Sequence, residues 1–249
     1  MGAGGTVDFG FEAVPRAEKS SLVRAVFDSV APRYDLMNDL ASLGIYRLWK
    51  RAMIDWLRPR PGWLVADVAG GTGDVASRIL RRARGQARVV VVDVNARMVA
   101  EGRDRALDRG RTRGIDWLVG DAEHLPLRDR SVDAVTIAFG IRNVTDRAAA
   151  LAEARRVLKP GGRFLCLEFS PAAGPGLGAA YDAYSFRVVP EIGRLVTGDR
   201  EAYRYLVESI RRFPEPQAFA DMIRAAGLGQ VRVVPLSGGI AALHSAWRI

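Results

Sequence analysis

The stretch from Trp63 to Val94 constrains the fold more than any other part of the chain. It opens with an apolar run, Trp63 to Ala69, that leads directly into Gly70-Gly71-Thr72-Gly73. A helix-like segment, Asp74 to Arg84, and a run of valines, Val89 to Val94, complete it. A strand, a tight glycine turn, a helix and a second strand buried on both faces are typical of a parallel sheet covered by helices.

The same alternation extends over most of the chain. Helices are predicted at Ser20–Val30, Leu43–Leu57, Ala96–Leu107, Arg147–Leu158 and Gln217–Ala226. Further strands are predicted at Asp116–Val119, Val132–Phe139 and Arg163–Phe169, with a terminal strand pair at Val231–Pro235 and Ala242–Arg248. We therefore expect an α/β fold on a mostly parallel seven-stranded sheet with helices on both faces.

The 249 residues suit one domain with an ample core. Within it we expect a helical cap over residues 1–62, a core over 63–170, a helical insert over 171–216, and a terminal helix with a strand pair over 217–249. The insert begins with a Gly/Pro-rich segment, Pro171 to Leu177, and continues with mixed aromatic and basic residues, Tyr181 to Arg212. It is too long for a simple crossover, so it is a candidate cover for a substrate.

Charge and cysteine content limit the class of protein. The net charge is +9, but lysine occurs only at Lys19, Lys50 and Lys159, and arginine is spread along the whole chain. This distribution argues against nucleic acid and leaves room for contact with a membrane surface. No apolar run approaches the ~20 residues that span a bilayer. The single Cys166 and the lack of a Cys/His cluster give no metal site, and the chain fits a cytoplasmic setting, with a peripheral position at the inner membrane face as an option.

The glycine turn is the candidate ligand site. Gly71 to Ala76 fits the dinucleotide fingerprint G-x-G-x-x-[GA], which by itself is a weak signal. Asp93 ends the next strand, where a carboxylate can hold two ribose hydroxyls. NAD and S-adenosylmethionine both carry such a ribose, so Asp93 does not distinguish them.

Three features favour S-adenosylmethionine over NAD. Asp67 ends the strand before the glycines, and an acid there suits a ligand with an ammonium and a sulfonium. Asp121 closes the third strand, where its carboxylate can accept the adenine amino group. No second catalytic domain follows, as a dehydrogenase of this type usually needs. A strand-end turn residue for Asp93 and a helix N-cap for Asp121 are the structural alternatives.

Three longer motifs resemble the ubiquinone/menaquinone C-methyltransferases, which are class I, Rossmann-like methyltransferases. The first motif is Tyr34 to Asn38 with Ser42 and Arg47 to Lys50. The second runs from Arg156 to Ser170, and Phe139 to Val144 lies between the two. The resemblance extends from about Val23 to the C-terminus. Tyr46 stands where the family has a histidine, and Ala138 stands where many members have a serine.

The resemblance implies C-methylation of a polyprenyl benzoquinol or of demethylmenaquinol with S-adenosylmethionine in a bacterium. Deprotonation of a quinol hydroxyl would make the ring carbon nucleophilic, and Arg142 is the first choice for the positive group that favours the phenolate. Asn143 is expected to hold a quinol oxygen, and Tyr34 and Asp35 to cover the cofactor or assist proton removal. The predicted cofactor contacts are Asp67, Gly71, Thr72, Gly73, Asp93, Asp121, Ala122 and Ala138.

Other functions and assemblies stay open at this point. The alternatives are a class I methyltransferase for another small aromatic or lipid, an NAD-dependent oxidoreductase, and a protein that binds without catalysis. A homodimer or a larger biosynthetic complex is compatible with the sequence, as is either quinone pathway. Because a polyprenyl tail is insoluble in water, the insert is expected to approach a membrane surface.

Overall fold

The computed structural model describes residues 5–30, 44–110, 113–171, 191 and 200–249. Its centre is a seven-stranded sheet in the order β5-β4-β3-β6-β7-β9-β8. The strands are β3 (Leu64–Val68), β4 (Arg88–Asp93), β5 (Ile115–Val119), β6 (Val132–Ala138), β7 (Leu158–Phe169), β8 (Gly229–Leu236) and β9 (Ala241–Trp247). The first five pair in parallel, while β9 is antiparallel to β7 and β8 antiparallel to β9. The predicted sheet is confirmed.

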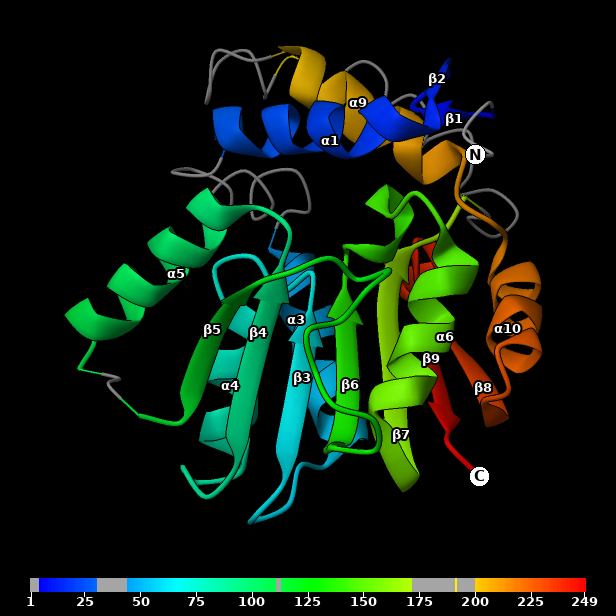
Figure 1. Ribbon diagram of the computed structural model, residues 1–249. Coiled ribbons are helices and arrows are strands. Elements are labelled where there is room, and N and C mark those ends of the chain that lie inside the picture. The colour runs from blue at the N-terminus through cyan, green and yellow to red at the C-terminus, as the bar shows by residue number, and fades with distance from the viewer. Residues whose placement is uncertain (1–4, 31–43, 111–112, 172–190, 192–199) are drawn as a thin grey trace.

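Helices cover both faces of the sheet (Figure 1). They are α1 (Arg16–Val30), α3 (Ile45–Leu57), α4 (Asp74–Arg82), α5 (Ala96–Asp108), α6 (Arg147–Val157), α9 (Arg200–Arg211) and α10 (Pro216–Ala225). The buried face of α3 and α4 packs on one side of the sheet and that of α6 and α10 on the other. Each helix predicted from the sequence is present, with ends that differ by a few residues.

Alternation of side chains along the central strands produces the two cores. Val89 and Val91 of β4 point to the layer of α3 and α4, whereas Val90 and Val92 point to the layer of α6 and α10. All four are nearly or fully buried, because side chains in a strand point alternately to its two faces. The valine run is therefore central to the sheet, as its composition predicts.

The Lys159–Gly162 segment lies between the predicted helix Arg147–Leu158 and the predicted strand Arg163–Phe169, where we expect a turn. In the structure it is part of the strand. α6 ends at Val157, and β7 begins at once with Leu158. The pairing with β6 then jumps from Val132–Leu158 to Ala134–Arg163, so the four residues form a bulge within β7. Gly161 has a φ of 73°, which glycine adopts without strain.

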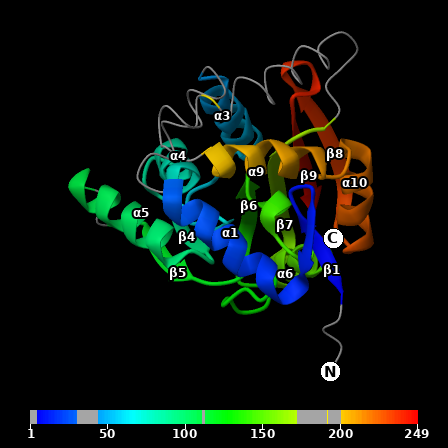
Figure 2. The same cartoon turned by 90° about the horizontal axis from the view of Figure 1, so that it is seen from above.

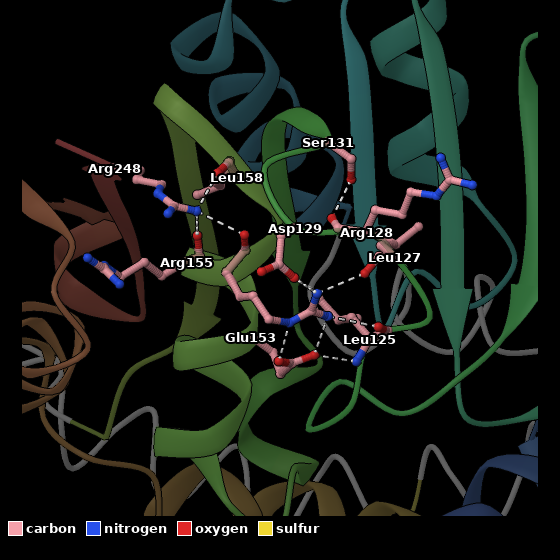
Figure 3. A network of polar contacts seen from close by, with 10 residues as sticks. Leu125, Leu127, Arg128, Asp129, Ser131, Glu153, Arg155, Leu158 and Arg248 are labelled. Carbon is pink, nitrogen blue, oxygen red and sulfur yellow. Dashed lines mark hydrogen bonds and ion pairs between the residues drawn. The ribbon is translucent and has the colours of Figure 1, made fainter.

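Arg156 of α6 connects this helix to the segment between β5 and β6, and its partners Leu125, Leu127, Asp129 and Glu153 are labelled in Figure 3. Its guanidinium donates to the carbonyls of Leu125 and Leu127 and to the carboxylates of Asp129 and Glu153. Glu153 in turn accepts the backbone N–H of Leu125 at 2.7 Å. The network holds the loop that begins at the carboxyl end of β5.

Two helices lie over the carboxyl ends of the parallel strands. Figures 1 and 2 show α1 and α9 side by side above this edge of the sheet. A hairpin of β1 (Thr6–Phe9) and β2 (Glu12–Pro15) adjoins them. The sequence analysis missed this hairpin, because its two strands are short and largely exposed. Of the helical insert, only Pro171, Glu191 and the residues from Arg200 onward lie among the described residues, and α9 falls within it.

Candidate active site

A pocket of about 1070 Å³, part of it open to solvent, lies at the carboxyl ends of β3, β4, β5 and β6. Parallel α/β sheets bind ligands at this edge, where the loops of neighbouring strands diverge. The predicted residues that line it are Asp67, Gly71, Thr72, Asp93, Asp121, Ala122, Ala138 and Asn143. Residues from four successive strand ends therefore meet in one place, as the sequence predicts.

The glycine turn after β3 has the tight backbone that the motif predicts. Gly71 has a φ of 54°, and its N–H donates to Asp93 Oδ2 at 2.8 Å. Gly73 is also left-handed, and a Cβ atom there would lie 2.5 Å from the Trp117 ring. Gly73 does not line the pocket in the described structure. Its position at the start of α4, packed on β5, explains the need for glycine at least as well as a ligand contact does.

The ends of β3 and β6 carry unusual backbone conformations. Ala69 and Phe139 both have positive φ, 51° and 59°, although neither is glycine. Gly140 fits between them, since a Cβ at this residue would lie 2.4 Å from that of Ala69. Strained residues of this kind persist where the surrounding structure fixes them, often at ligand sites. Both strained residues border the pocket.

Asp67 is fully buried at the end of β3. Its Oδ1 accepts a 2.8 Å hydrogen bond from Thr136 Oγ1, while its Oδ2 is buried without a hydrogen-bond partner among the described residues. Burial raises the pKa of this carboxyl to about 7, and the Thr136 hydroxyl and the charge of Lys50 oppose the rise. A buried carboxylate with an unused oxygen is suited to a cationic ligand.

Asp93 is the last residue of β4, and Asp121 lies two residues after the end of β5. Asp93 accepts hydrogen bonds from the N–H groups of Gly71 and Asn95, and burial raises its pKa. Asp121 Oδ1 accepts the N–H of Glu123 at 2.9 Å, so it also stabilises its own turn. Both residues therefore stabilise local turns, as the structural alternatives proposed. Both also line the pocket.

α1 forms the roof of the pocket through Ser20, Val23, Arg24 and Phe27. One end of the helix is held by Lys19, whose ammonium donates to the Val144 carbonyl at 3.3 Å. The other end is held by Asp28, which accepts the side-chain N–H of Asn95 at 2.8 Å. Asn95 also caps α5, so one side chain joins the roof to the wall of the pocket.

Arg142 is buried and ion-paired. It lies in the 3-10 turn η2 (Ile141–Asn143), and its guanidinium donates to Glu168 Oε1 at 2.9 Å and to the Phe139 carbonyl. Both members of the pair are at most 4% exposed. Arg142 is not among the residues that line the pocket. Glu168, which the sequence analysis missed, could have been suspected from a lone acid within the apolar strand β7.

Asn143 projects from the same turn into the pocket. Its Oδ1 accepts a 3.0 Å hydrogen bond from the hydroxyl of Tyr205, a residue of α9. Burial raises the pKa of Tyr205 to about 12, although Arg142 and Arg147 oppose the rise, so the phenol keeps its proton at neutral pH. The acceptor atom of Asn143 is thus engaged, and its amide N–H groups remain for other partners. Nothing in the sequence signalled that Tyr205 would be close.

Lys50 is the principal pocket residue that the sequence analysis did not assign. It lies on α3, lines the pocket, and donates to Asp74 Oδ2 at 3.0 Å. Tyr46, which replaces the family histidine, is one turn earlier and 4% exposed, and its ring packs at a tilt against that of Phe139 with centroids 4.9 Å apart. The sequence contained a signal for Lys50, because it is one of three lysines in an arginine-rich chain and lies in the first motif.

Tyr34 and Asp35 lie outside the described residues.

The strand order and the pocket at the carboxyl ends of the parallel strands define the fold of the class I methyltransferases. Structures with this fold include a SAM-dependent methyltransferase from Thermotoga maritima, with a TM-score of 0.65 and 22% identity over 90% of this chain and 99% of that chain. A second, from Aquifex aeolicus, gives a TM-score of 0.59 and 18% identity over 80% of this chain and 89% of that chain. The [4+2]-cyclase SpnF is also similar, with a TM-score of 0.60 and 20% identity over 92% of this chain and 96% of that chain. The last example shows that this fold alone does not fix the reaction.

The sequence identifies the family. Residues 15–248 match the ubiE/COQ5 methyltransferase family, and the chain belongs to it. The ubiquinone/menaquinone biosynthesis C-methyltransferase UbiE of Methylobacterium nodulans is 60% identical over 98% of this chain and 97% of its own length. UbiE of Brucella abortus (strain S19) is 53% identical over the whole chain and 94% of its own length. The predicted family resemblance is confirmed.

Proposed function

We propose that this protein transfers a methyl group from S-adenosylmethionine to a ring carbon of a polyprenyl benzoquinol or of demethylmenaquinol. The observation that carries the proposal is the convergence of Asp67, Asp93 and Asp121 from three strand ends on one pocket. It occurs in a chain 60% identical to a UbiE enzyme over nearly its whole length. S-adenosylmethionine, when bound, supplies a methyl group already activated by the adjacent sulfonium.

The residues fit that donor. In our proposal Asp93 holds the ribose hydroxyls and Asp121 with Ala122 faces the adenine, which is supported by the presence of all three in the pocket lining. The buried, unpartnered Asp67 Oδ2 offers an acceptor to an ammonium group. Gly71 and Thr72 form the floor between them. Ala138, beside them, lacks the hydroxyl that a serine would offer, which is worth about 1 kcal/mol for a typical hydrogen bond.

The quinol ring requires a group that favours the phenolate. In our proposal the Asn143 amide N–H groups donate to a quinol oxygen, because the Tyr205 hydroxyl already engages its carbonyl oxygen. Arg142 supports this arrangement from η2, where Glu168 balances its charge and the Phe139 carbonyl fixes its direction. Arg142 is then a positioning residue, which acts through the turn that carries Asn143. Tyr34 stays a candidate for covering the cofactor or for proton removal.

The polyprenyl tail of the substrate bears on where in the cell the protein acts. We propose peripheral contact with a membrane, because a polyprenyl chain partitions into lipid. In the described part of the chain no helix is long and apolar enough to cross a bilayer. Beside α9, the exposed Arg212 lies over the Phe11 ring, which is 49% exposed, and this basic–aromatic pair suits a lipid interface. Stronger binding to anionic than to neutral vesicles is expected, and equal affinity would contradict an electrostatic contact.

Two measurements test the function directly. Cells that lack the gene are expected to accumulate a quinone precursor short of one methyl group, as read by mass spectrometry. The purified protein is expected to transfer a labelled methyl from S-adenosylmethionine to a demethylated quinol. Transfer to another aromatic or lipid with no turnover of the quinol would assign the protein to a different class I substrate. No uptake of S-adenosylmethionine would remove the enzymatic assignment.

A further inference from the structure

Lys50 is a buried cation in a pocket that five acids line, and the other basic residue of the lining, Arg24, is exposed. Its residue is 5% exposed, and the pocket also contains Asp67, Asp74, Asp93 and Asp121. Lysine is almost never this buried without a specific partner, because removing an ammonium from water is costly. The Lys50 Nζ atom has an ion pair with Asp74 at 3.0 Å, and it lies 3.9 Å from the centre of the Tyr46 ring.

The ion pair with Asp74 does not fully neutralise the charge of Lys50. Asp74 is shared with Arg78, whose Nε lies 3.1 Å from Oδ1 and 3.0 Å from Oδ2. One carboxylate thus faces two cations, which leaves an excess of one positive charge. Arg78 does not line the pocket, whereas Lys50 does. The ammonium carries three N–H donors, and the contact with Asp74 requires one of them.

Asp67 presents the opposite charge in the same pocket. Its Oδ2 is buried with no hydrogen-bond partner among the described residues, and the charge of Lys50 acts on its carboxyl. The pocket therefore offers a spare acceptor from Asp67 and spare donors from Lys50. A group that carries an ammonium and a carboxylate on one carbon would satisfy both. The amino-acid end of S-adenosylmethionine has this structure.

We propose that Lys50 and Asp67 form a clamp for the zwitterionic end of the methyl donor, in which Lys50 binds the α-carboxylate and Asp67 the α-ammonium. The inference rests on the proposed function, since it takes S-adenosylmethionine as the donor. Lys50 is then a specificity residue, which distinguishes the complete donor from adenosyl compounds that lack the carboxylate. Asp74 and the Tyr46 ring hold its ammonium in place.

Calorimetric binding of two ligands to the full-length protein tests the clamp. The ligands are S-adenosylmethionine and decarboxylated S-adenosylmethionine, which retains the ammonium, sulfonium and nucleoside but lacks the carboxylate. The wild-type protein is expected to prefer the complete donor. Lys50→Met is expected to weaken binding of S-adenosylmethionine by about 10- to 100-fold, the range for a charge-assisted hydrogen bond, with little change for the decarboxylated compound.

Two variants separate the clamp from a purely structural role of Lys50. Arg78→Met removes the other partner of Asp74 from outside the pocket, so it is expected to keep the preference for the carboxylate. Lys50→Arg keeps the charge and is expected to keep most of the preference, which provides a second readout should Lys50→Met fold poorly. Thermal unfolding of each variant reports its folded state.

The outcomes are distinct. Equal weakening of both ligands by Lys50→Met, or the same loss of preference in Arg78→Met, would overturn the clamp while leaving the methyltransferase intact. A wild-type protein that binds both compounds equally would also overturn it. Failure of the wild type to bind either compound would instead overturn the proposed function, and the clamp with it.

Discussion

The pocket has two halves that were built in different ways. The strand-end half consists of the last residues of the strands, such as Asp67 of β3 and Asp93 of β4, and of the short segments that follow β3, β4, β5 and β6. The helical cover consists of α1, α3 and α9, and its contacts join residues far apart in the chain. Lys19 and Val144 are 125 positions apart, and Asn143 and Tyr205 are 62 apart.

This difference indicates which residues of a site can be predicted from the local sequence pattern. In the strand-end half, the end of a strand fixes where a side chain lies, since parallel strands deliver their carboxyl ends to one edge. In the cover, a helix is placed by packing and by single hydrogen bonds to distant loops. We therefore expect changes at the strand ends, such as Asp67, to act on cofactor binding, and changes at the contact of α9, such as Tyr205, to act on turnover.

The largest effect is expected at the junction of the halves, in the buried Arg142–Glu168 pair. Arg142→Met leaves a buried carboxylate without its partner, so it is expected to lower the free energy of unfolding by about 3–5 kcal/mol and to abolish turnover, with cofactor binding retained. Urea unfolding, calorimetry and a methyl-transfer assay measure the three quantities. The double variant Arg142→Met/Glu168→Met is expected to recover most of the stability and none of the turnover. Full activity in Arg142→Met would remove Arg142 from the mechanism.

A somewhat smaller effect is expected from Asp67, in the strand-end half. Its pKa is raised from 3.8 to about 7 by burial, so it contributes stability that is fully present below pH 3.8 and lost as the pH rises to about 7. Asp67→Asn is therefore expected to be more stable than the wild type, without ligand, by an increasing margin between pH 5 and pH 8, roughly 2–4 kcal/mol at most. The same variant is expected to bind S-adenosylmethionine more weakly.

Two further measurements accompany the pH series: a control variant, and the affinity of the wild type for S-adenosylmethionine. Asp116→Asn alters an exposed aspartate on β5 and is expected to leave the pH dependence of unfolding unchanged. In the wild type, affinity for S-adenosylmethionine is expected to fall as the pH drops from 7.5 to 5.5, because a protonated Asp67 is a poorer partner for an ammonium. A flat affinity over this interval would show that Asp67 does not contact the cationic end.

The smallest effect is expected in the helical cover, at Tyr205. Tyr205→Phe removes one neutral hydrogen bond, which is worth about 1 kcal/mol, so kcat is expected to fall by about five- to tenfold with unchanged affinity for S-adenosylmethionine. Asn143→Asp keeps an acceptor for the Tyr205 hydroxyl but removes the donor that faces the pocket, and it is expected to reduce kcat more. Equal stability of Asn143→Asp and wild type would confirm that its defect is not structural. An unchanged kcat in Tyr205→Phe would show that Asn143 needs no orientation by α9.

The sequence by itself determined the strand-end half of this protein. The glycines after β3, the aspartates that end β3, β4 and β5, and the valine run of β4 all lie where their local pattern predicts. These positions follow from two short-range facts: side chains alternate along a strand, and a tight turn at the start of a helix needs glycine. The family motifs also include residues at the ends of the strands, such as Phe139 after β6.

Only the tertiary structure decided the partners within the cover. The charge of Arg142 is balanced by Glu168, Tyr205 orients Asn143, and Lys50 enters the pocket beside Tyr46. The pairings of Arg142 with Glu168 and of Tyr205 with Asn143 have no spacing that a helix or strand period would reveal, whereas Tyr46 and Lys50 lie one helical turn apart and only their place in the pocket depends on docking. They depend on how α3 and α9 dock over the sheet, and docking is decided by the sum of many small packing terms spread over the whole chain.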